Sequence, residues 1–145
     1  MAAMTTVMAW GLIEFKQGYV AAGELQNAEA AVRWSLDYFI KAHPSANEFY
    51  GQLGDGNVDH AFWGRPEEFP SSSARPAFKI SANAPGSDLA GEAAASFAAG
   101  YLVFKDSDAS YAATLLRHGR ELYDFANQYR GTYVDAITNA GAFYK

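Results

Sequence analysis

The chain has 145 residues, of which 50% are hydrophobic and 15% aromatic, so it can bury a sizeable core within one domain's worth of sequence. Its net charge of -5 and its pI near 5.1 provide no basic stripe to neutralise phosphates, which argues against nucleic acid and fits a neutral polar ligand such as a carbohydrate better. The absence of cysteine excludes disulfides and thiolate metal sites, and no run approaches the roughly 18 apolar residues of a membrane span.

A first helix is predicted over residues 3–19, because large apolar side chains recur there at helical spacing. They are Met4, Val7, Met8, Leu12, Phe15 and Tyr19. No Ser, Thr, Asp or Asn precedes this run as an N-cap, and no basic leader or cleavage site is visible. The chain also ends after a glycine-bearing loop without a closing element, so both ends are expected to be cut.

A second helix is predicted from about Leu25 to Ala42. Pro44 ends it, because proline disfavours helical geometry at the residue before it. Trp34 and Tyr38 add a second apolar direction to the regular apolar face, so this helix is expected to contact neighbours on more than one side. The first two helices and their short glycine-containing link predict an αα-hairpin.

A second hairpin is predicted farther along the chain. Its first helix begins near Ser87 or Asp88, either of which can cap free N–H groups, and runs to about Lys105. A stripe of small residues on this helix lets another helix approach closely. The stripe is Ala90, Ala94 and Ala98. The next helix extends to about Tyr129, since its apolar residues alternate steps of three and four. The predicted fold class is all-α: two αα-hairpins joined by a long aromatic loop region, with a trailing loop over residues 130–145.

Residues 49–66 form the most unusual stretch, with four glycines, four aromatic rings, two aspartates, a histidine and an arginine. Each glycine costs a helix roughly 1 kcal/mol relative to alanine, and apolar and polar residues do not alternate across 55–59 as in a strand. We therefore predict a loop here, and a loop rich in rings is expected to line a pocket. Residues 75–80 could form a short strand, because Phe78 and Ile80 alternate with smaller or polar neighbours.

Two interpretations are open for Asp55 and Asp59. Glycoside hydrolysis uses a pair of carboxyl groups at a defined separation. Alternatively, Asp55 forms a turn with Gly56 while Asp59 braces the loop, and the flanking glycines favour this second interpretation. No helix start is expected after Gly56, so we do not expect a phosphate cradle, and the calcium pattern of an EF-hand is absent.

His60 is the most interesting titratable residue, because it lies between Asp59 and Trp63 in the glycine-rich stretch. The neighbouring carboxylate can fix the tautomer of His60 or raise its pKa, although a purely structural hydrogen bond is the alternative. Trp63 could belong to the core, or it could offer an apolar ring on which a pyranose stacks. Arg65 could orient a ligand oxygen or pair with a nearby glutamate.

The remaining histidines and tryptophans have simpler interpretations. His118 lies on the apolar face of the last helix and is expected in the core. His43 precedes a proline at a helix end and is expected to be a cap or a surface residue. Trp10 and Trp34 lie on helices at core spacing and are expected to be packing residues.

Seven segments form a set of linked motifs in a fixed order. They are Met8–Phe15 (MAWGLIEF), Asp37–His43 (DYFIKAH), Tyr50–Gly56 (YGQLGDG), Asp59–Glu67 (DHAFWGRPE), Arg75–Ile80 (RPAFKI), Pro85–Glu92 (PGSDLAGE) and Tyr129–Gly131 (YRG). Together they cover essentially the whole chain and resemble glycoside hydrolase family 9, and the animal endoglucanases of termites and molluscs look most similar. The spacer Ser71–Ser73 departs from the family pattern by being slightly longer.

The resemblance implies a secreted, inverting endo-β-1,4-glucanase with an (α/α)6 barrel, acting on cellulose and cello-oligosaccharides. It implies substrate-binding roles for His60, Trp63, Phe143 and Tyr144. Neither nucleic acid nor a membrane is expected as a partner. The alternative is a catalytically inactive carbohydrate-binding protein of the same fold.

The same resemblance places the catalytic groups outside this chain. The family's Asp-Ala-Gly-Asp motif, which supplies the water-activating carboxylate, would lie shortly before Met1, and the acid glutamate would lie near the end of the full domain. Residues 1–145 are therefore expected to be an internal piece of a catalytic domain, without a catalytic residue and inactive alone. Calcium ligands of some members would follow just after Tyr144, so no cofactor is expected within the chain.

Overall fold

The computed structural model describes residues 1–70 and 72–143. Its helices are α1 (Ala2–Glu14), α2 (Lys16–Ala22), α3 (Leu25–Ala42), α4 (Gly56–Ala61), α5 (Ser87–Phe104), α6 (Ala109–Gln128) and α7 (Tyr133–Ala136), and its 3-10 turns are η1 (Pro66–Glu68) and η2 (Thr138–Ala142). Its strands are β1 (Glu48–Leu53) and β2 (Ala77–Ser81). Within the described residues, none of the helices combines the length and the apolar character needed to cross a membrane.

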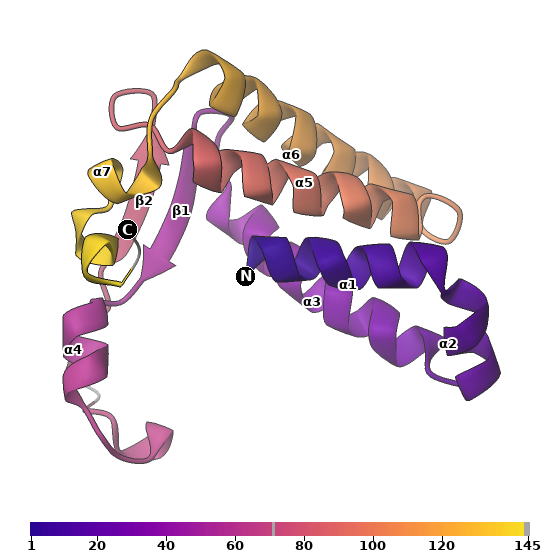
Figure 1. Ribbon diagram of the computed structural model, residues 1–145, viewed down its shortest axis with the longest axis horizontal. Helices are drawn as coiled ribbons and strands as arrows, with labels where there is room; N and C mark the ends of the chain where they lie inside the picture. The colour runs from indigo at the N-terminus through magenta and orange to yellow at the C-terminus, as the bar shows by residue number, and fades with distance from the viewer. Residues whose placement is uncertain (71, 144–145) are drawn as a thin grey trace.

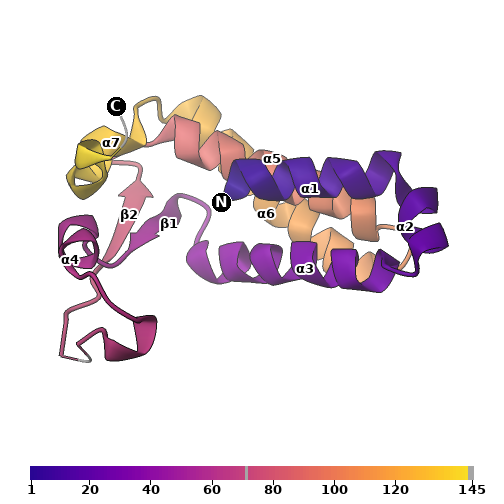
Figure 2. The ribbon, with the colours of Figure 1, turned by 60° about the horizontal axis from the view of Figure 1, so that its bottom comes forward.

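The long helices lie side by side, and the strands, α4 and α7 gather at one end of them (Figures 1 and 2). This arrangement confirms the all-α class and the two hairpins, with α1 and α2 leading into α3 and with α5 leading into α6. The predicted first helix is broken at Phe15, whose φ of -115° and ψ of 25° are not helical. The ends of α3, α5 and α6 agree with the sequence prediction within one residue.

The core lies around α5, which contacts α1, α3 and α6. The stripe of alanines on α5 meets Gly119 of α6, where an added Cβ would lie 3.5 Å from the carbonyl oxygen of Ala94. Phe97 of α5 is fully buried and meets Phe39 of α3 edge to face, with ring centroids 6.3 Å apart. Small side chains on α5 therefore let its neighbours approach closely, as the alanine stripe predicted.

Most of the large apolar side chains whose spacing predicted α1 are not buried by the structure. The buried residues of α1 are Leu12, which belongs to the predicted run, and four small residues: Ala2, Thr5, Thr6 and Ala9. The large side chains Met4, Val7 and Met8 are exposed, as are Trp10 (57%) and Trp34 (72%), so neither tryptophan packs in this core. The reason is that α1 packs against the alanine-rich α5, where only small side chains allow close contact.

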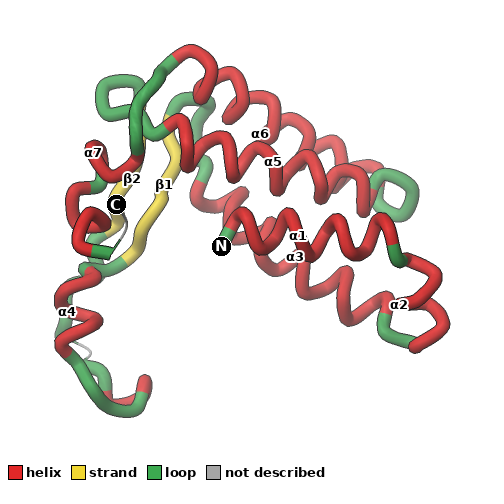
Figure 3. The backbone as a smooth tube through the Cα atoms, in the orientation of Figure 1, coloured by secondary structure: helices red, strands yellow, loops and turns green. Residues whose placement is uncertain are grey.

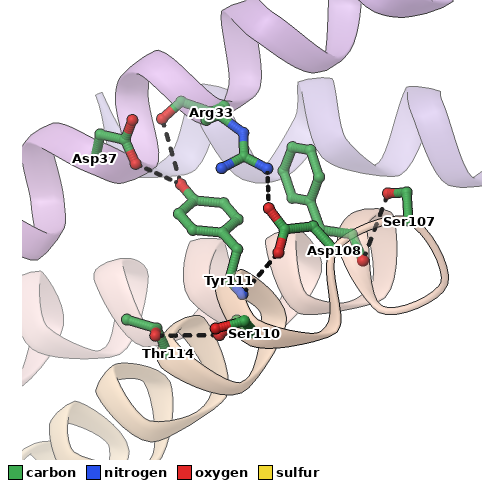
Figure 4. A network of polar contacts seen from close by, with 8 residues as sticks. Arg33, Asp37, Ser107, Asp108, Ser110, Tyr111 and Thr114 are labelled. Atoms are coloured by element: carbon green, nitrogen blue, oxygen red, sulfur yellow. Dashed lines mark hydrogen bonds and ion pairs between the residues drawn. The ribbon is translucent and has the colours of Figure 1, made fainter.

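A polar network joins the two hairpins at the end opposite the strands (Figure 4). Arg33 of α3 forms an ion pair with Asp108 at 2.8 Å, and its guanidinium lies 3.8 Å from the ring centroid of Tyr111. Asp108 also accepts a hydrogen bond from the backbone N–H of Tyr111, which caps α6. The hydroxyl of Tyr111 donates to Asp37 at 2.7 Å. Burial and this carboxylate raise the pKa of Tyr111 well above its ordinary value, so it remains a donor.

The prediction that residues 49–53 form a loop is wrong, because β1 pairs there with β2 as an antiparallel ribbon (Figure 3). The register is irregular between Tyr50 and Gln52, where a bulge forms at Gly51. This bulge interrupts the alternation that would have identified the strand. An added Cβ at Gly51 would overlap Leu89 of α5, so the ribbon runs directly against the start of that helix. The short strand predicted at residues 75–80 is confirmed as β2.

Gly100 of α5 provides a test of the close packing in the core. In a Gly100→Ala variant the new Cβ would overlap the buried Leu36 and lie 3.2 Å from Leu115. This overpacking should lower the free energy of unfolding by about 1–3 kcal/mol. Replacing a glycine by alanine at an uncrowded helical position should instead raise the free energy of unfolding by up to about 1 kcal/mol. We expect Gly100→Ala to lower the calorimetric melting temperature of the complete protein. The exposed Gly18→Ala in α2, which has open space around it, should raise it slightly or leave it unchanged. A higher melting temperature for Gly100→Ala would contradict this packing.

Candidate functional site

A hollow of about 660 Å³ lies at the end of the molecule where the ribbon meets α4 and η2. Its walls come from the second half of β1, α4, the first turns of α5 and the end of η2. Charged and polar groups lie on these walls, including Asp59, His60, Asp88 and Glu92, together with the ring of Phe143. Residues 51–60 of the aromatic stretch thus contribute to a hollow as expected, but none of the four aromatic rings of that stretch lines it.

The segment after Asp55 is a helix, which corrects the prediction that no helix starts there. Asp55 is the N-cap of α4, and its Oδ1 accepts hydrogen bonds from the backbone N–H groups of Asn57 at 2.8 Å and Val58 at 3.3 Å. These bonds satisfy donors that a glycine-rich sequence would otherwise leave to water, which offsets the low helix propensity. The side chain of Asn139 and these two N–H groups hold the pKa of Asp55 below its ordinary value. Asp55 is thus an ionised cap, not a proton donor.

Asp59 is also bound by the protein itself. Its carboxylate forms an ion pair with Arg75 at 2.5 Å, and the Arg75 guanidinium lies 5.5 Å from the ring centroid of Phe69. Gly54 makes room for this pair: its φ is +88°, and an added Cβ would lie 2.7 Å from the guanidinium. Asp59 therefore braces α4 against the segment that leads into β2, as the second sequence interpretation proposed.

The structure brings together two of the four predicted substrate-binding residues. The imidazole of His60 on α4 stacks on the ring of Phe143, with centroids 4.4 Å apart and planes tilted by 22°. Both side chains line the hollow. Trp63 follows α4 and is 100% exposed, so its ring is not a core residue. Tyr144 lies outside the described residues, as does Ser71 of the predicted long spacer.

Asn139 of η2 was missed by the sequence analysis. Its Oδ1 accepts hydrogen bonds from Gln52 Nε2 at 2.6 Å and from the backbone N–H of Gly56 at 3.0 Å. These partners lie 87 and 83 positions away in the sequence, so no local pattern identifies Asn139. It nevertheless joins β1, α4 and η2, through Gln52 and Gly56, which both line the hollow.

A second polar cluster lies inside the helical core, and it corrects one prediction. His43 is the C-cap of α3, as one of its two interpretations predicted, but it is buried, at 3% exposed, and is not a surface residue. Its Nδ1 lies 2.7 Å from Nδ1 of His118, which is buried as predicted. Arg117 can only donate, so Nε2 of His118, 2.9 Å away, must accept from it. His118 then carries its proton on Nδ1 and donates it to His43. Burial lowers the pKa of both histidines, that of His118 to about 4, so the pair is neutral.

Glu121 completes a group of three potential metal ligands with these histidines, and it is the one such group within residues 1–70 and 72–143. The Nδ1–Nδ1 distance of 2.7 Å is that of a hydrogen bond. Two imidazole nitrogens on one tetrahedral zinc ion would lie about 3.3 Å apart. Calcium prefers six to eight oxygen ligands, so this nitrogen-rich group does not fit calcium either. The geometry supports a hydrogen-bonded pair.

Comparison with known proteins gives a consistent result over the whole chain. The sequence profile described as Glycosyl hydrolase family 9 matches residues 1–145. The chain is 49% identical over 144 residues to Endoglucanase A of Bacillus pumilus and 51% identical over 145 residues to Endoglucanase 19 of Arabidopsis thaliana. These matches cover 99% and 100% of this chain but 22% and 23% of the relatives' lengths.

Solved structures agree with the sequence matches. An endoglucanase from the termite Nasutitermes takasagoensis, determined at pH 2.5, superposes with a TM-score of 0.94 at 58% identity, over 99% of this chain and 33% of that one. The cellulase Cel9M of C. cellulolyticum in complex with cellobiose superposes with a TM-score of 0.84 at 34% identity, over 90% of this chain and 30% of that one. The two hairpins are thus part of an (α/α)6 barrel, and the chain spans a third or less of these proteins.

The histidine pair predicts a pH-dependent stability. The unfolded chain protonates His118 below about pH 6.5, whereas the folded chain resists protonation until about pH 4. The free energy of unfolding should therefore decrease as the pH falls from about 6.5 to 4, by roughly 2–3 kcal/mol. In the complete protein, His118→Gln should lower the melting temperature at pH 7.5 and flatten its decrease towards pH 4.5.

The control for this measurement is His60→Gln, which removes an exposed histidine and should leave the pH dependence as in the wild type. The assignment of a neutral buried pair would be wrong if the wild type and His118→Gln lost stability in parallel between pH 7.5 and pH 4.5.

Proposed function

The chain belongs to glycosyl hydrolase family 9, and from this premise we propose that it forms one wall of the substrate cleft of an inverting endo-β-1,4-glucanase. The observation that carries the proposal is the stacked pair of His60 and Phe143 on the wall of the hollow, with the exposed Trp63 close to it in sequence. The relatives' names and the cellobiose complex of Cel9M support a β-1,4-glucan as the ligand.

The chemistry of these side chains suits a sugar chain. A pyranose presents an apolar face of C–H groups and a polar edge of hydroxyls, so it is bound well by a ring on one side and hydrogen-bonding groups on the other. The indole of Trp63 is fully exposed and can stack on the apolar face. The imidazole of His60, held flat against Phe143, offers a hydrogen bond to a hydroxyl.

No acid and base for hydrolysis are proposed among the described residues. Inversion needs two carboxyl groups about 6.5–9.5 Å apart with a water between them. Asp55 caps α4 and Asp59 is paired with Arg75, so both aspartates of this stretch have structural partners. The proposal assigns the acid and the base to other parts of the complete protein, and it assigns binding and positioning of the glucan to this chain.

Two further features belong to the proposal. The complete protein acts outside the cell, because an insoluble polymer such as cellulose cannot reach an internal enzyme. Any calcium site of the complete domain is assigned to residues beyond those described, because the one candidate group of metal ligands within residues 1–70 and 72–143 is rich in nitrogen and calcium prefers oxygen.

The direct test is hydrolysis of carboxymethylcellulose. We expect the complete protein to release reducing sugar with inversion of the anomeric centre, observed by proton NMR of the first products. We expect the isolated 145 residues to release none. Binding of cello-oligosaccharides by the complete protein without hydrolysis would instead favour a catalytically inactive binding protein, and hydrolysis by the isolated chain would overturn the assignment of the catalytic groups elsewhere.

A second prediction concerns Trp63. In the complete protein, Trp63→Ala should weaken cellotetraose binding by about 2- to 10-fold, the factor expected for the loss of one ring contact. Because the ring of Trp63 is fully exposed, the melting temperature should not change. Trp63→Phe keeps an aromatic face and should retain most of the affinity. Equal calorimetric affinities for all three proteins would show that Trp63 is not a stacking surface.

A further inference from the structure

The cleft wall joins two neighbouring elements, β1 and α4, to η2, which lies more than 80 residues farther along the chain. Gln52 lies near the end of β1, Asp55 and Gly56 lie at the start of α4, and Asn139 lies in η2. Figure 1 shows α7 and the turn after it beside the ribbon and above α4. His60 and Phe143 therefore belong to separate segments, α4 and the end of η2, and their stacking depends on how these segments are joined.

The side chain of Asn139 joins all three segments. Its Oδ1 accepts from Gln52 Nε2 at 2.6 Å and from Gly56 N at 3.0 Å, and Gln52 Nε2 also donates to the carbonyl oxygen of Gly54 at 3.0 Å. Its amide group is also the main cause that lowers the pKa of the neighbouring Asp55 carboxyl. Asn139 thus accepts from two donors with its oxygen and keeps an NH2 donor for the Asp55 carboxylate, a combination that a carboxylate in its place cannot provide.

Phe143 forms a second connection between η2 and α4. An added Cβ at Gly56 would lie 2.5 Å from the ring of Phe143, so the ring packs directly on the first residue of α4. The same ring stacks on His60 at the other end of this short helix. Asn139 holds the start of α4 and Phe143 covers it, so a displacement of Asn139 would separate the ring from His60.

We propose that Asn139 is a positioning residue for glucan binding: it fixes α4 against η2, so that His60 and Phe143 present one binding surface. This role rests on the proposed function only for the identity of the ligand. The geometry of the three segments stands independently of it.

The test uses Asn139→Asp in the complete protein. A carboxylate keeps both acceptor functions, but it cannot donate to Asp55 and places a like charge beside it. At pH 7 we expect cellotetraose to bind about tenfold more weakly than to the wild type. At pH 4.5 a proton shared by the two carboxyl groups restores a donor, so the affinity ratio to the wild type should approach one.

Two further variants make the test specific. Asn139→Asp combined with Asp55→Asn exchanges the two side chains, keeps an amide–carboxylate hydrogen bond and keeps a good N-cap, so it should recover most of the affinity at pH 7. Asn57→Asp adds the same charge to an exposed position of α4 and should bind as the wild type does. A weakened affinity of Asn139→Asp that does not depend on pH, or that the exchange does not recover, would overturn the proposal.

A measurement without substrate separates this proposal from the proposed function. The ring protons of His60 should carry an upfield ring-current shift from Phe143 in the wild type, and Asn139→Asp should lose it at pH 7 and regain it at pH 4.5. An unchanged shift in Asn139→Asp at pH 7 would overturn the positioning role. If the wild type showed the shift but bound no cello-oligosaccharide, the choice of ligand would be wrong and the positioning role would stand.

Discussion

The small side chains of α5 are the constraint on which the rest of the structure depends. Alanine and glycine on this helix let α1, α3 and α6 approach it from different sides, and Gly100 and Gly119 mark where the approach is closest. The first turn of the same helix supports the cleft, because Leu89 packs against Gly51 of β1 and Asp88 accepts from the backbone N–H of Tyr133 at 2.9 Å. One helix therefore sets both the packing of the core and the position of the binding wall.

Some side chains of the wall hold the structure together, and others are free to contact a ligand. Asp55, which caps α4, and Asp59, which pairs with Arg75, have the structural roles that the sequence favoured over an acid pair. This leaves the rings of His60, Phe143 and Trp63 as the groups best suited to contact a sugar. A surface of rings and hydrogen-bonding groups suits the binding and alignment of a glucan, whereas inverting hydrolysis also needs two carboxyl groups with a water between them.

Much of the fold was predictable because it follows local rules. Helices α3 and α6 have strong apolar periodicity, and the linked motifs identified the family. The features that the sequence did not predict depend on contacts with residues far away in the chain or on irregularities that hide a local pattern. The burial of His43 depends on His118, which lies 75 residues away, and α4 forms because Asp55 caps it and Asn139 supports it. Strand β1 was hidden by its bulge. The buried face of α1 was misassigned because that helix is apolar on several sides, and only its contact with α5 decides which side is covered.

The central claim is that α4 and η2 together form a surface for a β-1,4-glucan. The most direct measurement is a crystal structure of the complete protein with cellotetraose bound. We expect one pyranose ring stacked on the indole of Trp63 and a sugar hydroxyl within hydrogen-bonding distance of His60, with Phe143 still stacked on the imidazole. Density for the oligosaccharide at another face of the protein, with Trp63 and His60 both free of sugar, would contradict it.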